Sequence, residues 1–319
     1  MAAGQPFLDT RDWNLETGKV TEHVQTKRDI QEILEVAGVH PQRRFGQHFL
    51  IDGNLMRRLV ESVELTPDDW VIEVGPGTGG LTDLLAARAA RIIAVEIDRT
   101  FYGILVDRFR ENENVTLLFG DVLDGKHHLM PELARAIRAG GAGRPTLKLV
   151  ANLPYQAATP LIMNLLVDFP KVRQLCFTVQ AEVGARITAK PGTKDYGPLS
   201  ILCQSLCTIT TIARVGPQCF WPVPHVDSVM LRLDVRETPM IPRDELPGFA
   251  ALVRAVFDHR RKQLRRALQY ACNHVDFSRR PLDFDLSRRP EELAIDEWLA
   301  LFRALPTPRR NAAMATDRC

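Results

Sequence analysis

Hydrophobic and polar residues alternate in two different rhythms between residues 54 and 235. Short β-branched runs that end in polar or glycine-rich turns indicate buried strands, and the longer segments between them have the apolar spacing of amphipathic helices. The strand-like runs are Val71–Val74, Arg91–Ile97, Val115–Phe119, Thr146–Ala151 and Gln174–Val179. The helix-like segments are Leu81–Arg91, Phe101–Glu111, Leu129–Arg138 and Pro160–Val167. This alternation predicts an α/β fold with a doubly wound, mostly parallel sheet.

The pattern changes twice towards the C-terminus. Two strand-like runs, Thr208–Val215 and Ser228–Val235, follow one another without a helix between them and predict an antiparallel pair at one edge of the sheet. After Pro239 the pattern is helical, and the best segments are Leu246–His259, Arg260–Tyr270 and Ile295–Leu305. We therefore expect an N-terminal extension (1–40), a main α/β domain (41–238), a small all-α domain (239–306) and a loose tail (307–319).

Composition fits a globular protein and excludes several other classes. The chain has 319 residues, of which 45% are hydrophobic and 25% charged. No apolar run approaches the roughly 18 residues of a membrane span, and Met1 to Trp13 lacks the apolar core of a secretory signal. Six cysteines without a C-x-x-C motif argue against a disulfide framework, and Cys203 and Cys207 supply only half of a tetrahedral zinc site. We expect a cytoplasmic protein with no metal and no membrane contact.

The distribution of charge is more informative than its sum. Lys and Arg number 41 against 39 Asp and Glu, but residues 243–319 contain 15 basic and 11 acidic residues. The basic residues concentrate at Arg260, Arg261, Lys262, Arg265 and Arg266. Such a cluster can contact nucleic-acid phosphates, but it can equally be the solvated face of a helix, and charge alone does not decide between them.

A glycine-rich turn follows the first predicted strand, in Glu73-Val74-Gly75-Pro76-Gly77-Thr78-Gly79-Gly80. Bare backbone at the start of a helix lets a ligand approach closely. The spacing fits both the G-x-G-x-x-G pattern of dinucleotide sites and the G-x-G-x-G pattern of adenosylmethionine enzymes, and glycines can also serve only a tight turn. Both ligand patterns need an acidic residue about 20 positions later to hold ribose hydroxyls, and Glu96 has that position.

Two later strand ends supply further polar groups. Asp121 ends the third predicted strand, where its carboxylate could accept a hydrogen bond from an adenine amine or simply cap the next helix. The fourth strand ends at Asn152-Leu153-Pro154-Tyr155, at the edge of the sheet where ligands bind.

This tetrapeptide suits the methylation of an aromatic amine. The lone pair of such an amine is delocalised into the ring, so the site must hold the nitrogen as it becomes tetrahedral. The Asn152 side-chain oxygen and the Leu153 carbonyl oxygen could accept hydrogen bonds from the two N–H groups of the amine, since Pro154 keeps the backbone at Leu153 extended. Tyr155 could stack on the base, which offsets part of the free energy of unstacking it.

Six ordered blocks make the chain resemble a known family, the bacterial small-subunit rRNA adenine dimethyltransferases of the KsgA type. The blocks are Arg44–Leu50, Glu73–Gly77, Asn152–Tyr155, Tyr196–Ser200, Phe220–Ser228 and Arg260–Arg265. The resemblance covers Arg43 to about Leu268 and implies the class I adenosylmethionine-dependent methyltransferase fold.

The resemblance also implies roles for individual residues. The cofactor S-adenosyl-L-methionine would be held by His48, Leu50, Gly75, Gly77, Glu96, Asp121 and Asn152. The catalytic residues would be Asn152, Leu153, Pro154, Tyr155 and Phe220. Tyr155 and Phe220 would bracket the target adenine, although Phe220 could equally belong to the core. The basic residues Arg260 to Arg266 would contact rRNA phosphates.

The implied reaction is the dimethylation of N6 on two adjacent adenines near the 3′ end of 16S rRNA, in the 30S subunit or its precursor. We expect a monomeric enzyme that acts during small-subunit biogenesis. One alternative is a non-catalytic rRNA-binding assembly factor that retains the fold. A nicotinamide-dependent oxidoreductase would need a hydride-transfer partner that we do not find after the sheet, and a large-subunit rRNA adenine methylase fits the Pro222-Val223-Pro224 block and the basic C-terminal domain less well.

Overall fold

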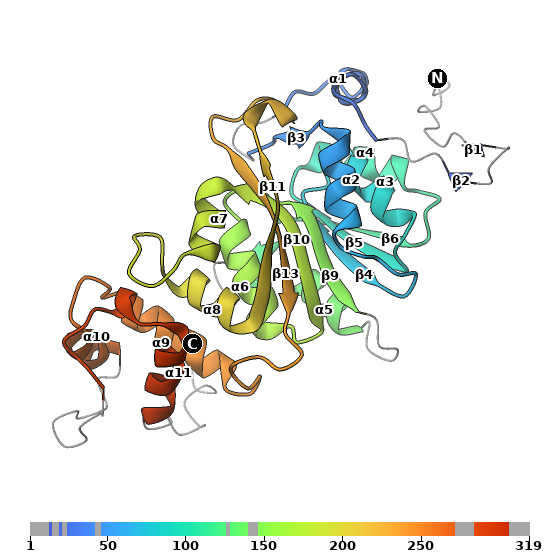
Figure 1. The fold of residues 1–319 in the computed structure, drawn as a ribbon. Coiled ribbons are helices and arrows are strands. Elements are labelled where there is room, and N and C mark those ends of the chain that lie inside the picture. The colour runs from blue at the N-terminus through green and yellow to red at the C-terminus, as the bar shows by residue number, and fades with distance from the viewer. Residues whose placement is uncertain are drawn as a thin grey trace, which may run out of the picture. The chain divides into compact units, whose positions relative to one another are not determined.

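The computed structural model describes residues 24–41, 46–125, 128–139, 146–271 and 284–305, and the backbone of 13–14 and 19–20 (Figure 1). Arg43, Arg44 and the expected tail 307–319 lie outside the described residues. The chain forms two compact units. The first unit comprises Met1–Gly184 and Thr208–Val235, and the second comprises Ala185–Cys207 and Arg236–Cys319.

A seven-stranded sheet with the order β11-β13-β10-β9-β4-β5-β6 forms the centre of the first unit (Figure 1). Its strands are β4 (Trp70–Val74), β5 (Arg91–Glu96), β6 (Val115–Phe119), β9 (Leu147–Asn152), β10 (Val172–Gln180), β11 (Cys207–Val215) and β13 (Ser228–Val235). The pairs β10–β9, β9–β4, β4–β5 and β5–β6 are parallel, whereas β13 is antiparallel to β10. The predicted mostly parallel α/β sheet with an antiparallel edge is confirmed.

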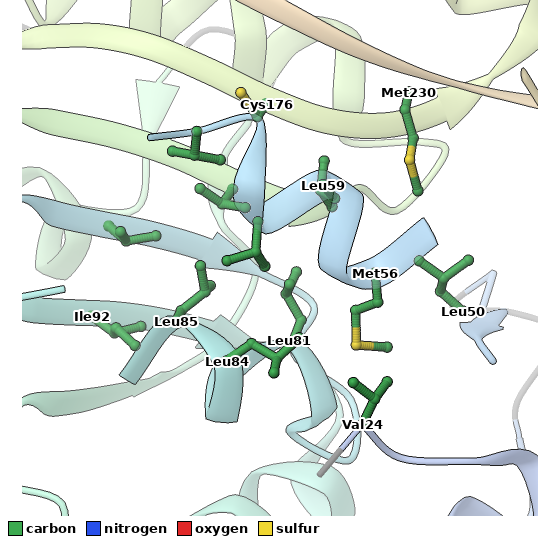
Figure 2. Close-up of a cluster of buried hydrophobic side chains, with 14 of the residues drawn as sticks. Val24, Leu50, Met56, Leu59, Leu81, Leu84, Leu85, Ile92, Cys176 and Met230 are labelled. Carbon is green, nitrogen blue, oxygen red and sulfur yellow. The ribbon is translucent and has the colours of Figure 1, made fainter. Parts of the chain in front are cut away.

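Helices connect the strands and bury their apolar faces against the sheet. They are α2 (Gly53–Glu61), α3 (Gly80–Ala86), α4 (Arg99–Arg108), α5 (Pro131–Ala139) and α6 (Ala158–Asp168). Figure 2 shows a core cluster in which Leu59 of α2, Leu84 and Leu85 of α3, and Ile92 of β5 pack together. Helix α3 ends five residues earlier than expected, because Arg91 already belongs to β5.

Three short antiparallel pairs accompany the main sheet. They are β1 (Trp13–Asn14) with β2 (Lys19–Val20), β7 (Leu123–Asp124) with β8 (His128–Leu129), and β3 (Phe49–Leu50) with β12 (Phe220–Trp221). The 3₁₀ turn η2 (Pro217–Cys219) leads into β12. The pair β3–β12 joins two segments that are about 170 residues apart in the sequence, and both belong to expected functional blocks.

The expected N-terminal extension contains a helix that the strand and helix pattern did not single out, α1 (Lys27–Val36). Thr26 and Asp29 form a capping box at its start. Ile30 and Leu34 lie on one face of α1 and are buried against Phe101 and Ile104 of α4. The segment 24–36 is therefore part of the first unit.

The second unit is helical, as expected. Its helices are α8 (Pro198–Leu206), α9 (Leu246–Phe257), α10 (Leu264–Ala271) and α11 (Ile295–Ala304), with a 3₁₀ turn η3 (Pro290–Glu292). Helix α9 contacts α8, α10 and α11. The expected boundary placed 185–207 with the α/β domain, but the structure groups this segment with the helical unit. The buried Tyr196 illustrates why, because its hydroxyl donates to the Leu293 carbonyl oxygen at 2.9 Å. Helix α7 (Ala181–Thr188) contains the boundary between the units.

The expected basic helix over Arg260–Tyr270 begins later than predicted. Helix α10 starts at Leu264, and Arg260, Arg261 and Lys262 lie in the turn between α9 and α10. The main-chain N–H of Leu264 donates to the Arg288 carbonyl oxygen at 2.7 Å, so a distant segment helps to fix the start of α10.

Candidate active site

A cavity lies in the first unit where the carboxyl ends of β4, β5 and β9 meet. Residues of three expected motifs line it, from the segments 46–50, 75–78 and 152–155, and Glu96 lines it from the end of β5. In an open parallel sheet, ligands bind at this edge. The structure therefore brings together motifs that are separated by about 100 residues in the sequence.

The glycine-rich turn touches both other motifs. Gly77 has a φ of +60°, and a Cβ atom there would lie 2.7 Å from Cε1 of Phe49. Gly75 has a φ of +70°, and its Cβ would lie 3.2 Å from Cγ of Pro154. Only glycine combines a left-handed backbone with such close approach, so these two positions let Phe49 and Pro154 pack directly against the turn.

Glu96 is buried beside this turn. Its carboxylate accepts hydrogen bonds from the main-chain N–H of Gly77 at 3.2 Å and of Asp98 at 2.8 Å. Desolvation nevertheless raises the pKa of Glu96 to about 7. A buried carboxylate next to a glycine-rich turn is a suitable acceptor for the hydroxyls of a ribose.

A second buried carboxyl group, Glu73, also lines the cavity, and the sequence reasoning gave it no role. The Thr82 hydroxyl donates to it at 2.7 Å. Burial raises the pKa of Glu73 to about 8, so its side chain is mostly protonated at neutral pH.

Asn152 ends β9 with its side-chain amide held in one orientation. Its Nδ2 donates to the main-chain carbonyl oxygen of His48 at 2.9 Å. This bond uses the amide nitrogen and leaves Oδ1 to accept from a ligand, as the expected role requires. The main chain of Leu153 is held in turn, because its N–H donates to the Thr178 carbonyl oxygen at 3.0 Å.

The ring of Tyr155 stacks against His48, with 5.8 Å between ring centroids and 28° between ring planes. His48 Nδ1 also lies 2.7 Å from the Pro222 carbonyl oxygen. The Tyr155 hydroxyl is buried and has no hydrogen-bond partner among the described residues. Tyr155 is thus positioned by ring contact.

Most of the expected cofactor and catalytic residues line this cavity. They are His48, Leu50, Gly75, Gly77, Glu96, Asn152, Leu153, Pro154 and Tyr155. Asp121 and Phe220 lie outside the cavity as the described residues form it. Asp121 is exposed at the end of β6 and accepts from the Leu123 main-chain N–H at 3.0 Å, which caps a turn. Its expected contact with adenine stays a prediction.

Phe220 is placed in the core instead of the cavity. Its side chain is 1% exposed and belongs to the same buried cluster as Leu50, with which it pairs in the β12–β3 ladder. The pairing holds its ring against apolar side chains, so the ring does not face Tyr155 across an open space in this structure. A role for Phe220 in bracketing the base stays a prediction.

The basic cluster of the second unit contains one residue with a structural role. Arg260 forms an ion pair with Glu291 at 2.7 Å and donates to the Lys194 carbonyl oxygen at 3.1 Å. The other members are exposed: Arg261, Lys262, Arg265 and Arg266. These four side chains face solvent, and their expected contact with rRNA phosphates stays a prediction.

Two residues that the sequence reasoning missed also line the cavity, Gln25 and Ile30. They come from the N-terminal extension, to which no role was assigned. The capping box at Thr26 and Asp29 signals the helix that carries Ile30, but no local pattern marks Gln25.

The fold and the site together are those of a class I methyltransferase. The sheet is mostly parallel, a glycine-rich turn follows its first strand, an acidic residue ends the second, and Asn-Leu-Pro-Tyr ends the fourth. Among the described residues, no helix is long and apolar enough to cross a membrane, and no three His, Cys, Asp or Glu side chains lie together as metal ligands would.

The chain belongs to the ribosomal RNA adenine dimethylase family, whose model matches residues 39–305. It is 38% identical over 272 residues to ribosomal RNA small subunit methyltransferase A of Moorella thermoacetica, covering 84% of this chain and 93% of that protein. The protein of the same name from Geobacillus sp. (strain WCH70) is 37% identical over 289 residues, which cover 88% of this chain and 97% of that protein.

Solved structures agree on the fold. A dimethyladenosine transferase from Plasmodium falciparum has a TM-score of 0.62 at 23% identity, covering 80% of this chain and 96% of that one. The 23S rRNA methyltransferase ErmE has a TM-score of 0.56 at 25% identity, and the match covers 81% of this chain and 99% of ErmE. The expected family and enzyme class are confirmed.

Proposed function

We propose that this protein dimethylates N6 of two adjacent adenines near the 3′ end of 16S rRNA, in the 30S subunit or its precursor. The family membership and the printed names of the relatives support a small-subunit rRNA substrate. The observation that carries the proposal is the orientation of Asn152, whose amide nitrogen is bonded to His48 while its oxygen remains available beside Tyr155. The enzyme would act in the cytoplasm as a monomer during small-subunit biogenesis.

The cavity fits S-adenosylmethionine as the cofactor. Gly75 and Gly77 line the cavity with their main chain, which a ligand can approach at the start of a helix, and the buried Glu96 offers an acceptor for ribose hydroxyls. His48 and Leu50 would complete the pocket, with Asp121 near the adenine. When bound, the cofactor supplies an electrophilic methyl group on a sulfonium.

The chain's own residues would position and activate the target amine. Asn152 Oδ1 and the Leu153 carbonyl oxygen accept the two N–H bonds of the adenine amine, which favours the tetrahedral nitrogen over the delocalised one. No strong base is required, because the N6 proton becomes acidic only as the new bond forms. Catalysis would then rest mainly on how these residues position the amine for transfer of the methyl group that the bound cofactor would supply.

The exposed basic residues Arg261, Lys262, Arg265 and Arg266 would hold the rRNA backbone. Lys and Arg contacts to phosphates position a nucleic acid without reading its sequence. Arg260 contributes less to this surface, because Glu291 already neutralises it.

The direct test is to incubate the protein with labelled S-adenosylmethionine and unmethylated 30S particles, and then to map the labelled bases. The expected product is N6,N6-dimethyladenine at two adjacent positions near the 3′ end of 16S rRNA. Binding to the particle without any label would instead indicate an assembly factor that retains the fold, and label on 23S rRNA alone would indicate a large-subunit enzyme.

A further inference from the structure

Gln25 is a buried polar residue that joins the N-terminal segment to the glycine-rich turn. Its side-chain Nε2 donates to the main-chain carbonyl oxygen of Thr78 at 3.2 Å, and the Thr78 hydroxyl donates to Gln25 Oε1 at 2.6 Å. Both residues are 2% exposed. Gln25 precedes the part of the chain that the family model matches, which begins at residue 39.

The turn is shaped to receive this side chain. A Cβ atom at Gly80 would lie 2.8 Å from Gln25 Oε1, so the glycine makes room for the amide. Gly79 has a φ of +88° and directly precedes α3, so the amide of Gln25 packs where the turn becomes a helix. Without Gln25, the main-chain carbonyl of Thr78, a residue that is 2% exposed, would lose this hydrogen bond, and an unsatisfied buried carbonyl is costly.

Apolar contacts on both sides hold Gln25 in place. Val24 belongs to the core cluster of Figure 2, and a Cβ atom at Gly53 of α2 would lie 3.1 Å from its Cγ1. On the other side, Ile30 and Leu34 anchor α1 against α4. Phe49 of β3 packs against the cluster that Ile30 and Leu34 form with α4. The segment therefore cannot move away from the turn without exposing apolar surface.

We propose that Gln25 is a positioning residue of the cofactor site, which holds the Thr78 peptide so that the glycine-rich turn is preorganised for S-adenosylmethionine. This inference rests on the proposed function, because it assumes that the cavity binds this cofactor. Gln25 and Thr78 both line the cavity. Fixing the turn in advance lowers the free energy that cofactor binding would otherwise spend on ordering it.

The test compares Gln25→Met with Gln31→Met in the full-length protein. Methionine keeps the length of the side chain and removes its hydrogen bonds, and Gln31 is exposed on α1. We expect Gln25→Met to raise the calorimetric Kd of S-adenosylmethionine about tenfold, the effect of losing roughly one net hydrogen bond. The KM for this cofactor should rise while kcat and the KM for 30S particles at saturating cofactor stay the same. Gln31→Met should match the wild type.

Several results would overturn the inference. A Kd within twofold of the wild type, with or without a lower melting temperature, would make Gln25 a structural residue only. If Gln25→Met does not fold, Gln25→Asn keeps an amide but shortens the side chain by one methylene, which draws its nitrogen away from the Thr78 carbonyl oxygen. An unchanged Kd in that variant contradicts the inference. A wild-type protein that binds no S-adenosylmethionine would instead refute the proposed function, before any variant is compared.

Discussion

Replacing Asn152 with Ala tests the central chemical step. In the structure, Nδ2 of Asn152 donates to the His48 carbonyl oxygen at 2.9 Å, and this bond does not use Oδ1, the proposed acceptor for the target amine. The alanine variant removes that acceptor and leaves only the Leu153 carbonyl to hold the amine. Loss of one preorganised polar group of this kind lowers kcat by about 10²–10³, or about 2.7–4 kcal/mol of transition-state stabilisation.

The fold should tolerate this change. The side chain is only half-buried, and losing a single neutral hydrogen bond costs about 1 kcal/mol, against a typical stability of about 5–15 kcal/mol. Asn152→Asp is a sharper variant, since it keeps an acceptor but turns a second oxygen towards the His48 carbonyl. Repulsion there would rotate the side chain, so we expect this variant to be impaired as well.

The assay is single-turnover transfer of labelled methyl groups to unmethylated 30S particles, with melting temperatures measured in parallel. Asn54→Ala is the matched control, because Asn54 is exposed on α2 and away from the cavity lining. A transfer rate for Asn152→Ala within threefold of the wild type, in a folded protein, would refute the assigned role.

Four further predictions concern base capture, pH, salt and an ion pair of the second unit. Tyr155→Phe should retain full activity, because the buried hydroxyl has no partner among the described residues. Tyr155→Ala should raise the KM for 30S particles by the factor that corresponds to losing roughly 1–3 kcal/mol of base stacking, and it should leave the Kd of the cofactor unchanged. Burial raises the pKa of Glu96 from 4.5 to about 7, so between pH 4.5 and 7 the folded protein keeps a proton that the unfolded chain has released. The melting temperature of the cofactor-free protein should therefore fall as the pH rises through this window. A fall of the same size in Glu96→Gln would contradict this explanation. Replacing Arg265 and Arg266 with Ala should reduce the slope of log affinity for rRNA against log salt by about one to two, and an unchanged slope would remove these residues from the interface. Arg260→Ala should mainly lower the melting temperature, because it breaks the pair with Glu291.

The sheet was predictable because its signals are local. Buried parallel strands read as short apolar runs that end at turns, and Val115–Phe119 and Ser228–Val235 match β6 and β13 at both ends. The candidate site followed from the same logic, since side chains at the carboxyl ends of neighbouring parallel strands must lie near one another. Gly75, Glu96 and Asn152 are at these ends, and all three line one cavity.

What the sequence could not show depends on contacts between distant segments. The partner of Gln25 is Thr78, so no window around Gln25 reveals its role. The start of α10 at Leu264 is supported by a hydrogen bond from its N–H to the Arg288 carbonyl oxygen. The three basic residues at 260–262 therefore lie in a turn, and not in the helix that the sequence predicted. Phe220 follows the same rule, because its burial depends on pairing with Leu50.

His48, in the loop at residues 46–50, contacts two residues of the Asn-Leu-Pro-Tyr motif in different ways. The main-chain carbonyl of His48 orients Asn152, while its imidazole stacks on Tyr155 and meets the Pro222 carbonyl. These two functions use different parts of the residue. The orientation of the Asn152 amide therefore depends on the course of the backbone, which the β3–β12 pairing fixes, and not on the imidazole. The imidazole contacts the ring of Tyr155, the proposed stacking partner of the base. A change of side chain at this position should therefore alter the proposed capture of the base and leave the orientation of the Asn152 amide unchanged.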